Sequence, residues 1–422
     1  MDTIAKIGMD CVGCRSCEQS CPSKCITIVE NSEGFLYPVI AEDVCVKCGV
    51  CLKKCPINMT EKEEHHPLEA YALKAKDKSF LFNSASGGAS DVAVKAVLDR
   101  GGYAYGAAYD ENFSVSHIEV SDEEGRKRIQ SSKYVQSDLK DTFSKAKERV
   151  ENGEMVLFTG SPCQIAGLYA FLGRDYDNLY TIDLICHGVP SPKFLQKYFE
   201  YQERRMKGRI VYFNFRSKDK RGWGTQYLLK TKTKTKTKTL ALDKYGKHFM
   251  DGDCYRESCY KCKFANLNRP ADLTVGDFWG INRCHPEFSS PLGVSSVLVN
   301  SKNGKQLLEL MKKNAEILPV SVNDVLIKQG NLVKPTMRTN IRDGFYKKIN
   351  SDTFIEKLQV GIQVKERVKC ILPRTVIEQL KRINWRGMGS TMIKKIHGGG
   401  GVILNSKYYY PASLLVKMRR IA

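Results

Sequence analysis

A cysteine pattern that occurs twice within the first 56 residues constrains this chain more than any other feature. Cys11 to Pro22 has the sequence C-V-G-C-R-S-C-E-Q-S-C-P, and Cys45 to Pro56 has C-V-K-C-G-V-C-L-K-K-C-P. Each run is therefore C-x2-C-x2-C-x3-C-P. Three thiolates at this spacing on a tight loop can reach three irons of one cubane, and the fourth, followed by proline, ligates the other cluster. The pattern predicts two interlocked 4Fe-4S clusters.

The interlocking assigns four ligands to each cluster. One cluster takes the first three cysteines of the first run and the last cysteine of the second, and the other takes the converse set. The two sets are Cys11, Cys14, Cys17 and Cys55, and Cys45, Cys48, Cys51 and Cys21. Small residues at Gly13, Ser16 and Gly49 let backbone N–H groups approach the sulfurs and stabilise the negative charge of a cluster. Residues 1–60 are predicted to form an α+β ferredoxin-like dicluster module.

A pair of structural zinc sites is the alternative, because C-x2-C pairs also bind zinc. The third cysteine in the middle of each run and the C-P ending favour iron–sulfur clusters over zinc. Cys25 follows the first run in C-I-T-I-V, and we interpret it as a small buried apolar residue on a strand rather than as a ninth ligand. The module thus uses eight of its nine cysteines as ligands.

The composition is that of a globular chain with reduced cysteines. The 422 residues have room for two or three domains, and 42% of them are hydrophobic. No stretch approaches the roughly 18 apolar residues of a membrane span, and no apolar segment precedes the first cysteine, so neither a span nor a secretory signal is expected. Sixteen cysteines in such a chain predict metal ligands rather than disulfides, and a cytoplasmic location.

The net charge of +21 suggests an anionic partner, substrate or surface. From Lys381 to the C-terminus there are nine Lys or Arg and no Asp or Glu, with aromatic and aliphatic residues between them. This pattern is typical of a basic amphipathic tail, and both an anionic membrane surface and a solvated closing helix stay open as its role. The basic residues do not form a pattern interleaved with aromatic residues or a known nucleic-acid-binding motif, so nucleic acid is not an expected partner.

Beyond the module the sequence divides into a linker, a large domain and a tail. The charged segment E-K-E-E-H-H-P places the linker at residues 61–69. Short β-type runs then alternate with helical patterns, which predicts an α/β domain with a mainly parallel sheet over residues 70–335. Helices are expected at 89–100, 138–150, 164–172, 192–201 and 305–313, and strands at 103–109, 155–158, 179–185, 271–280 and 293–300. Residues 336–422 are predicted to be an irregular basic C-terminal extension.

A change to period-two alternation predicts a β-rich extension of the large domain. Residues 209–215 form one such strand pattern, and residues 225–240, which contain the Lys-Thr repeat, form a β-ribbon or edge strand. The alternation puts lysines on one face and threonines on the other. A solvated strand face is favoured over an anion-binding strip, because no aromatic residue is interleaved.

Four further thiols lie where a parallel sheet would bring them together. Cys163 follows a strand and a Gly-Ser-Pro turn and opens a helix, whose N-terminal dipole favours a thiolate. Cys186 ends the next strand, and such strand ends share the rim at which α/β folds bind ligands. Cys259 and Cys262 supply a C-x2-C pair, with Cys254 five residues before it. A third 4Fe-4S cluster, a zinc knuckle and unligated active-site thiols are the alternatives left open.

Two weaker features are further candidates for a site. His187 adjoins Cys186 and is a candidate proton donor, with a hydrogen-bonding core histidine as the alternative. Ser86, Gly87 and Gly88 precede a helix, whose N-terminus can seat a phosphate of a bound nucleotide. Neither G-x-G-x-x-G after a strand nor G-x4-G-K-S/T occurs, so a standard Rossmann or P-loop site is not expected.

A series of motifs in residues 70–330 resembles the beta subunit family of coenzyme F420-reducing hydrogenases and dehydrogenases. The motifs are S-G-G-A-S, G-A-A-Y-D, S-S-K-Y-V-Q-S-D-L, F-T-G-S-P-C-Q-I-A-G-L, D-L-I-C-H-G-V-P-S-P, S-C-Y-K-C-K-F and T-V-G-D-F-W-G. The N-terminal extension resembles that of many bacterial members, which often occur with surface-polysaccharide biosynthesis enzymes. Members of this family and the similar 7-hydroxymethyl chlorophyll a reductases carry FAD beside an iron–sulfur cluster, so the resemblance implies FAD here.

The resemblance also implies which residues form the site. It favours four cysteines as ligands of a third cluster, and these are Cys163, Cys186, Cys259 and Cys262. Its motifs place FAD binding at Ser86, Gly87, Gly88, Ser132, Lys133, Tyr134, Gly160 and Asp277. Cys254 falls outside the family pattern, and His187 is the candidate catalytic residue.

These features together predict an iron–sulfur flavin-dependent oxidoreductase. Electrons from reduced ferredoxin or a similar redox protein would pass through the clusters and FAD to a small organic substrate, such as a sugar nucleotide or a cell-envelope precursor, or would flow in reverse from a deazaflavin. An electron-transfer adaptor subunit that reduces nothing itself is the alternative. The expected location is cytoplasmic, with peripheral contact at the inner face of the membrane through the basic tail.

Overall fold

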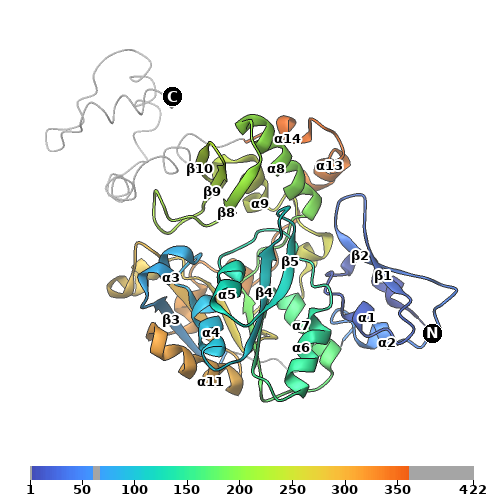
Figure 1. Ribbon diagram of the computed structural model, residues 1–422, viewed down its shortest axis with the longest axis horizontal. Coiled ribbons are helices and arrows are strands. Elements are labelled where there is room, and N and C mark those ends of the chain that lie inside the picture. The colour runs from blue at the N-terminus through green and yellow to red at the C-terminus, as the bar shows by residue number, and fades with distance from the viewer. Residues whose placement is uncertain (1, 60–66, 361–422) are drawn as a thin grey trace, which may run out of the picture.

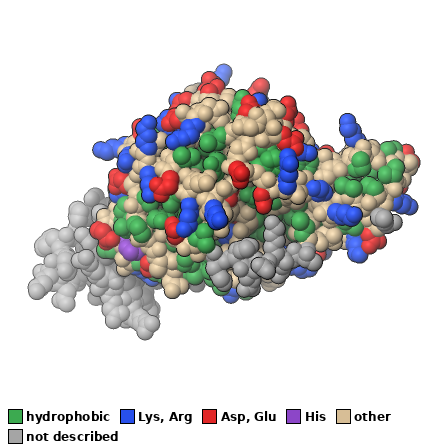
Figure 2. Space-filling view, turned by 90° about the horizontal axis from the view of Figure 1, so that it is seen from below, with side chains coloured by type: hydrophobic (Ala, Val, Ile, Leu, Met, Phe, Trp, Pro, Cys, Tyr) green, Lys and Arg blue, Asp and Glu red, His purple; other side chains and the backbone are tan. Residues whose placement is uncertain are grey.

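The structure is a computed structural model that describes residues 2–59 and 67–360 (Figure 1). A small N-terminal unit, blue in Figure 1, lies beside a larger body that carries the remaining described residues. Basic and acidic side chains are interspersed on the face drawn in Figure 2. In the described ranges, no helix is long and apolar enough to cross a membrane. The predicted α+β module followed by an α/β domain with a β-rich extension is confirmed.

The N-terminal unit has a core made largely of thiols. Its elements are η1 (Ile4–Asp10), α1 (Ser16–Gln19), the antiparallel pair β1 (Ile26–Glu30) and β2 (Leu36–Ile40), and α2 (Val50–Lys53). The buried cluster of this unit consists of Ile4, Cys17, Cys25, Ile26, Cys51 and Cys55. A unit of this size with so few aliphatic core residues cannot be stabilised by apolar burial alone, so bound metal clusters fit its folding requirement.

An eight-stranded sheet forms the centre of the larger body, in the order β13-β3-β12-β11-β7-β6-β4-β5. The strands are β3 (Glu69–Ala75), β4 (Tyr103–Tyr109), β5 (Val115–Val120), β6 (Val156–Gly160), β7 (Leu179–Leu184), β11 (Leu273–Asp277), β12 (Ser295–Val299) and β13 (Ala315–Val320). The central strands β11, β7, β6 and β4 are parallel neighbours, whereas the outer strands pair antiparallel. Parallel pairing thus dominates the centre, where crossover helices connect successive strands.

Helices cover both faces of this sheet. They are α3 (Lys78–Asn83), α4 (Ala89–Leu98), α5 (Glu123–Ile129), α6 (Thr142–Glu151), α7 (Pro162–Leu172) and α11 (Lys302–Met311). Leu157 of β6 packs with apolar residues of α4 and α11, and Phe158 packs with those of α6 and α7. The two-residue period of a strand sends these neighbours to opposite faces, so β6 is buried on both sides.

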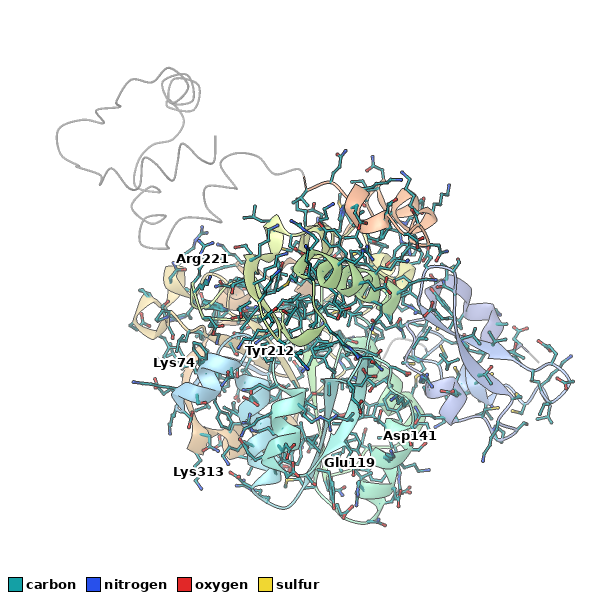
Figure 3. The ribbon with its side chains drawn as sticks, turned by 45° about the horizontal axis from the view of Figure 1, so that its top comes forward. Lys74, Glu119, Asp141, Tyr212, Arg221 and Lys313 are labelled. Carbon is teal, nitrogen blue, oxygen red and sulfur yellow. The ribbon has the colours of Figure 1, made fainter. Side chains whose placement is uncertain are left out.

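The β-rich extension is an antiparallel sheet in the order β10-β9-β8. It comprises α8 (Pro192–Met206), β8 (Ile210–Asn214), β9 (Gln226–Thr231), β10 (Thr235–Thr239) and α9 (Lys244–Asp251). In Figure 3, Tyr212 of β8 marks this half of the body, and Glu119 of β5 marks the half with the large sheet. The Lys-Thr repeat forms a β-ribbon, in which Thr231 N–H donates to the carbonyl of Lys234 across the turn.

The remaining described elements lie in the loops and after β13. They are η2 (Leu240–Leu242), η3 (Glu257–Lys261), α10 (Ile281–Cys284), η4 (Pro286–Phe288), η5 (Lys312–Asn314), α12 (Val322–Leu326), η6 (Gly330–Leu332), α13 (Arg342–Lys347) and α14 (Phe354–Lys357). Phe345 of α13 and Phe354 of α14 are buried in one aromatic core with Phe194 of α8 and Tyr245 of α9. The start of the expected irregular extension therefore packs on the large domain. The basic tail from Lys381 lies outside the described residues.

Candidate functional site

The two cysteine runs share one backbone conformation. Gly13 and Lys47, at equivalent positions, have φ of 72° and 53°, and Arg15 and Gly49 have φ of 60° and 75°. A lysine or arginine in this left-handed region is uncommon, and here each one is matched by a glycine at the equivalent position of the other run. These bends precede α1 and α2 and turn the cysteine of each short helix into the core of the unit. The sequence thus builds two equivalent cysteine loops.

The structure brings Cys55 of the second run to the first run. Burial raises the pKa of the Cys14 thiol, and the neighbouring thiols of Cys11, Cys17 and Cys55 raise it further. These four thiols are the set that the interlocked pattern assigns to one cluster. We call them the inner set, because Cys14 and Cys17 are buried, whereas Cys48 of the other run is exposed.

Two cysteines of the second predicted set, Cys21 and Cys45, lie next to Cys25. The Cys25 sulfur lies 3.4 Å from the Cys21 sulfur and also hydrogen-bonds to the Cys45 side chain. Cys25 is buried directly before β1, as expected, but it contacts two predicted ligands, which a purely apolar role does not describe. We call Cys21, Cys45, Cys48 and Cys51 the outer set.

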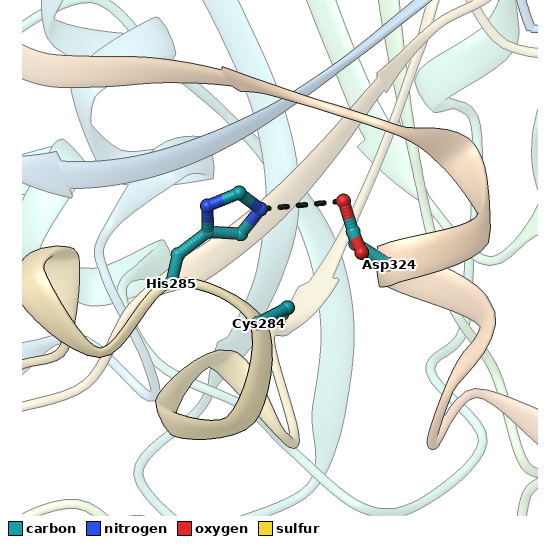
Figure 4. Close-up of side chains that lie close together, drawn as sticks. All are labelled: Cys284, His285 and Asp324. Atoms are coloured by element: carbon teal, nitrogen blue, oxygen red, sulfur yellow. Dashed lines mark hydrogen bonds and ion pairs between the residues drawn. The ribbon is translucent and has the colours of Figure 1, made fainter.

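Spacing of the thiols separates clusters from single ions. A tetrahedral zinc ion with Zn–S bonds of about 2.3 Å holds its sulfurs about 3.8 Å apart. Within the described part of the chain, only Cys284, His285 and Asp324 bring three candidate ligand atoms within 4.8 Å of one another (Figure 4). No three thiols of the inner or outer set lie within 4.8 Å of one another, so these sets are more open than the arrangement that a single zinc ion requires.

The close trio has a structural explanation. His285 Nε2 lies 3.2 Å from Asp324 Oδ2 (Figure 4), and the same carboxylate accepts the N–H and hydroxyl hydrogen bonds of Ser321, which begins α12. The Cys284 thiol points back at the carbonyls of Gly280 and Ile281. The trio is therefore a helix cap with an ion pair, and it contains none of the predicted ligands.

A third set of thiols converges at the rim of the sheet. Burial raises the pKa of Cys163 to about 12, and the nearby thiols of Cys262 and Cys186 raise it further. Burial likewise raises the pKa of Cys259, which adjoins Cys186 and Cys163. The structure thus brings together the four cysteines that we call the rim set, Cys163, Cys186, Cys259 and Cys262. Burial outweighs the helix dipole at Cys163 in the free thiol, and metal coordination would deprotonate it.

Backbone donors point at the sulfurs of the rim set. Gly188 N–H bonds to the Cys186 sulfur, and Val189 N–H bonds to the Cys259 sulfur. Gly188 has φ of 128°, and a Cβ there would lie 2.3 Å from the ring of Tyr255. Only glycine fits this turn, which aims the two donors. N–H···S bonds stabilise the negative charge that a cluster or a thiolate carries.

A buried ion pair holds the rim set in place. Arg269 donates to Asp183 Oδ1 at 2.8 Å, and both side chains are almost fully buried. The same guanidinium donates to the carbonyl of Leu184 at 2.9 Å and to that of Phe264 at 2.6 Å. These bonds tie the end of β7, which leads into Cys186, to the loop that follows the C-x2-C pair. Sequence reasoning missed Arg269, although an aspartate inside the apolar run of β7 indicated that a buried partner must exist.

The N-terminal unit lies directly on α7, next to the rim set. A Cβ at Gly167 would lie 2.7 Å from Cys14 Cβ and 2.9 Å from Cys14 Sγ, so Cys14 packs on the bare backbone of α7. Cys163 lies on the same helix, four residues earlier, which is about one turn or 6 Å of rise. The inner set and the rim set therefore contact one helix from neighbouring turns.

The loop that carries Cys259 makes a second connection to the inner set. Arg256 Nε donates to the carbonyl of Cys11 at 2.6 Å, and Ser258 Oγ donates to the same carbonyl at 3.1 Å. Arg256 also favours the charged form of Cys163, so its guanidinium lies between the two sets. Its Nη2 is buried without a hydrogen-bond partner among the described residues, and its guanidinium packs over the ring of Tyr37, 3.8 Å from the centroid.

Ion pairs fix the N-terminal unit around these contacts. Arg342 of α13 forms a bidentate pair with Glu33 at 2.5 and 2.6 Å, and Arg15 pairs with Asp138 at 2.6 Å. The Arg342 side chain is almost fully buried, which makes its charged hydrogen bonds strong. The unit is thus fixed on the large domain at several points, and residues 60–66 of the predicted linker lie outside the described residues.

Several of the residues predicted to bind flavin meet at Arg216. Its guanidinium donates to both carboxylate oxygens of Asp277, at 2.8 and 2.5 Å, and to the hydroxyl of Tyr134 at 2.8 Å. It also donates to the carbonyl of Ala85, beside Ser86. Sequence reasoning missed Arg216, and the one indication was an arginine directly after the apolar strand β8. The residue joins motifs that lie far apart in the sequence.

Two amines near Arg216 have no carboxylate partner among the described residues. Lys218 is buried and donates to the carbonyls of Leu81 and Ser86, and burial lowers its pKa to about 7. Lys133 donates to three carbonyls of residues 128–131, and burial lowers its pKa as well. A buried amine without a counter-ion fits an anionic ligand.

The other predicted flavin residues are less clearly arranged for a ligand. Gly87 packs so closely that a Cβ would lie 2.1 Å from the carbonyl of Leu73, and Gly88 begins α4 with φ of 86°. The first N–H of α4 lies 3.4 Å from Ser295 Oγ, so a phosphate there would displace a protein acceptor. Gly160 ends β6, Ser132 adjoins Lys133, and His187 is exposed beside Cys186.

Family models match two parts of the chain. The model for the C-terminal part of the beta subunit of coenzyme F420 hydrogenase/dehydrogenase matches residues 153–324. A 4Fe-4S dicluster domain model matches residues 10–59. The first range contains the whole rim set, and the second contains both cysteine runs.

Curated relatives match the N-terminal unit. They are the ferredoxin-type protein NapF of Haemophilus influenzae (34% identity, 11% of this chain and 27% of the relative), a ferredoxin of Rickettsia felis (36%, 16% and 59%) and a 7Fe ferredoxin of Hydrogenibacillus schlegelii (33%, 17% and 87%). The chain thus spans less than two thirds of the first two relatives and most of the third.

A similar solved structure is a chain of the F420-reducing NiFe hydrogenase complex from Methanosarcina barkeri. It has 19% identity and a TM-score of 0.42, and the match covers 73% of this chain and 95% of that one. The family assignment rests instead on the matched models and on the cysteine sets that they contain. The chain is therefore an iron–sulfur electron-transfer protein with a 4Fe-4S dicluster domain at its N-terminus, and it is related to the coenzyme F420 hydrogenase/dehydrogenase beta subunit family through residues 153–324.

Proposed function

We propose that this chain is an iron–sulfur flavoprotein oxidoreductase that passes electrons between a ferredoxin-type or deazaflavin partner and an organic substrate. The observation that carries the proposal is the convergence of the rim set next to the inner set, on one helix and one loop. The eight N-terminal ligands, a third 4Fe-4S cluster on the rim set and FAD are its parts. The proposed domains are residues 1–60, 61–69, 70–335 and 336–422.

The contacts support an order for the electron path. The inner set packs on Gly167 of α7 and accepts a hydrogen bond from Ser258, so it adjoins two of the three segments that carry the rim set. The outer set includes the exposed Cys48 and is the proposed entry for a redox partner. Electrons would then move from the outer set to the inner set and on to the rim set, one at a time.

The residues around Arg216 fit a flavin nucleotide. Lys218 supplies a buried amine and Lys133 a half-buried one, and neither has a carboxylate partner within the described ranges, which suits a pyrophosphate. Tyr134 stacks on Phe249 with ring centroids 4.5 Å apart and directs its hydroxyl to Arg216. When bound, FAD would collect two single electrons and exchange a hydride with the substrate. His187, exposed beside Cys186, is the proposed proton donor.

The proposed substrate is a sugar nucleotide or a related cell-envelope precursor of surface-polysaccharide synthesis. This part of the proposal rests on the resemblance of the motifs in residues 70–330. The proposed location is cytoplasmic, with the basic tail from Lys381 at the inner face of the membrane. Turnover of candidate sugar nucleotides by the reduced protein would test the substrate, and binding to anionic vesicles would test the location.

An anaerobic cofactor inventory tests the redox core. We expect about twelve irons and one FAD per chain, with no zinc. Cys259→Ser should lower the iron content to about eight while FAD is retained, because only the rim set loses a ligand. Cys284→Ser is the matched control and should leave about twelve. About eight irons in the unmodified protein would contradict the third cluster, and about eight irons without flavin would favour the adaptor subunit.

The flavin site is tested separately by two lysine substitutions. Lys218→Met removes a buried amine next to Ser86 and should lower the FAD content without changing the iron content. The control is Lys220→Met, since Lys220 is exposed two residues away. Equal FAD content in both variants would contradict the placement of the flavin near Arg216.

A further inference from the structure

A pocket of about 220 Å³ opens between α8, β10 and the start of α9, away from the residues assigned to clusters or flavin. Four of its lining side chains are cationic. These are Arg205, Lys236, Lys238 and Lys244. The acidic lining residue is Asp243, which leaves the lining with a net charge of +3. The pocket thus concentrates positive charge in a small volume.

None of the four cations forms an ion pair with a carboxylate in the part of the chain that the structure describes. Lys236 Nζ donates to Gln202 Oε1 at 2.7 Å, and Lys244 Nζ donates to the carbonyl of Ile355 at 2.7 Å. Arg205 Nη1 donates to the hydroxyl of Tyr201 at 3.0 Å. Neutral acceptors hold these side chains in position, and their charges remain uncompensated.

Asp243 offsets one of the four positive charges, but its oxygens already accept hydrogen bonds from other groups. Oδ1 accepts the N–H groups of Tyr245 and Gly246 as the N-cap of α9, and Oδ2 accepts the hydroxyl of Tyr227 at 3.1 Å. The first turn of α9 therefore has a protein partner, and the lysine and arginine side chains are the donors left for a ligand. Capping and ligand binding use separate groups here.

Burial and the neighbouring cations both disfavour the charged forms of two lysines in the pocket. Burial lowers the pKa of Lys236, and Lys238 and Arg205 lower it further, against the opposing effect of Asp243. Burial also lowers the pKa of Lys244, with the same two cations contributing. An anion bound between these side chains would favour the charged form of each lysine and raise its pKa.

The Lys-Thr repeat divides into two parts with different surroundings. Lys232 and Lys234 are exposed in and beside the turn of the ribbon, as a solvated strand face predicts. Lys236 and Lys238 are half-buried and line the pocket, so the expectation of a solvated face is wrong for this part. The reason is the fold of the ribbon, which lays β10 near α8. The exposed pair Lys232 and Lys234 can therefore serve as a matched control for substitutions of Lys236 and Lys238.

We propose that this pocket binds a small phosphate-bearing anion, with a pyrophosphate group as the unit that fits it. The volume is below the roughly 300–1,000 Å³ of pockets for drug-sized ligands, which favours a compact group. One phosphate monoester carries a charge of about −1.5 to −2, so two phosphate groups match the net charge of the lining. Free pyrophosphate and the diphosphate of a nucleotide share this chemistry.

Calorimetric titration of the purified, cofactor-loaded full chain with inorganic pyrophosphate tests the site. We expect one pyrophosphate per chain and at least tenfold weaker binding after Lys236→Gln with Lys238→Gln. The control pair, Lys232→Gln with Lys234→Gln, should bind as the unmodified chain does. Absence of binding, or equal weakening in both double variants, would overturn the pocket and indicate diffuse surface charge. Tighter binding of a nucleoside diphosphate than of pyrophosphate would identify a nucleotide as the source.

Footprinting on the unmodified chain gives a second measurement that does not depend on variants folding. Pyrophosphate should protect Lys236, Lys238 and Lys244 from acetylation and leave Lys232 and Lys234 reactive. Protection of all five lysines, or of none, would contradict the site. Iron and flavin contents are measured on the same samples, so failure of this site and failure of the redox proposal are distinguished.

Discussion

Replacing Gly167 with alanine tests whether the inner set lies on α7. The added Cβ would lie 2.7 Å from Cys14 Cβ and 2.9 Å from Cys14 Sγ, whereas ordinary contacts begin at 3.4 Å. Cys14 must therefore retreat by about 0.7 Å or α7 must shift. Overpacking of this kind costs about 1–3 kcal/mol, and the helix propensity gained by replacing glycine returns about 1 kcal/mol. The expected net destabilisation is up to about 2 kcal/mol.

Gly344 of α13 supplies the matched control, because a Cβ added there would have no heavy atom of the described residues within 4 Å. Gly344→Ala should gain the helix propensity without the clash and stabilise the chain by up to about 1 kcal/mol. Anaerobic urea unfolding, followed by cluster absorbance and by far-UV circular dichroism, measures both variants. Electron paramagnetic resonance of the reduced chain then shows whether the magnetic coupling between the inner and rim sets weakens. A Gly167→Ala variant as stable as Gly344→Ala, with unchanged coupling, would refute the contact.

Three further predictions concern the rim set, the flavin site and a buried histidine. Arg269→Met leaves Asp183 buried without its partner, so we expect the free energy of unfolding to fall by about 3–5 kcal/mol and the chain to lose about four irons. The double variant Arg269→Met with Asp183→Leu should recover part of the stability. Lys218→Met should reduce FAD affinity, measured by flavin fluorescence on titration, and the effect should shrink as pH rises above about 7, where the amine of the unmodified chain loses its proton. Burial lowers the pKa of His117 to about 4, so the unfolded chain binds a proton more readily between pH 6.5 and 4, and stability should fall with falling pH across that window by up to about 1.4 kcal/mol per unit. His117→Gln should flatten this part of a denaturation profile, and an unchanged slope would contradict the assignment.

Local patterns predicted the parts of the site that depend on local geometry. The two cysteine runs fix loop conformation within a few residues, and the structure gives equivalent left-handed bends at Arg15 and Gly49. Cys163 and Cys186 were expected at neighbouring strand ends, and β6 and β7 are parallel neighbours. Convergence of these two thiols followed from the alternation of strands and helices, which indicates which ends share a rim.

Contacts between distant segments gave no sequence signal. Gly167 lies in the motif F-T-G-S-P-C-Q-I-A-G-L, but nothing in that motif indicates that Cys14 packs on it. Arg216 and Arg256 follow no motif, because their partners lie on other elements. The Lys-Thr repeat also contains no glycine, proline or asparagine, so the position of its turn and the burial of β10 depended on packing against α8.

The docking contacts explain how a module with few aliphatic core residues can serve as a fixed part of an electron path. Its core is mainly thiols, so its folding depends on the clusters that it holds. The proposed electron path also needs the inner set at a constant separation from the rim set. Contacts with the large domain keep this separation constant. They are the packing of Cys14 on Gly167, the hydrogen bonds from Arg256 and Ser258 to Cys11, and the buried Arg342–Glu33 pair. Metal binding would therefore fold the module, and the large domain would fix its position, so the two requirements are met by different residues.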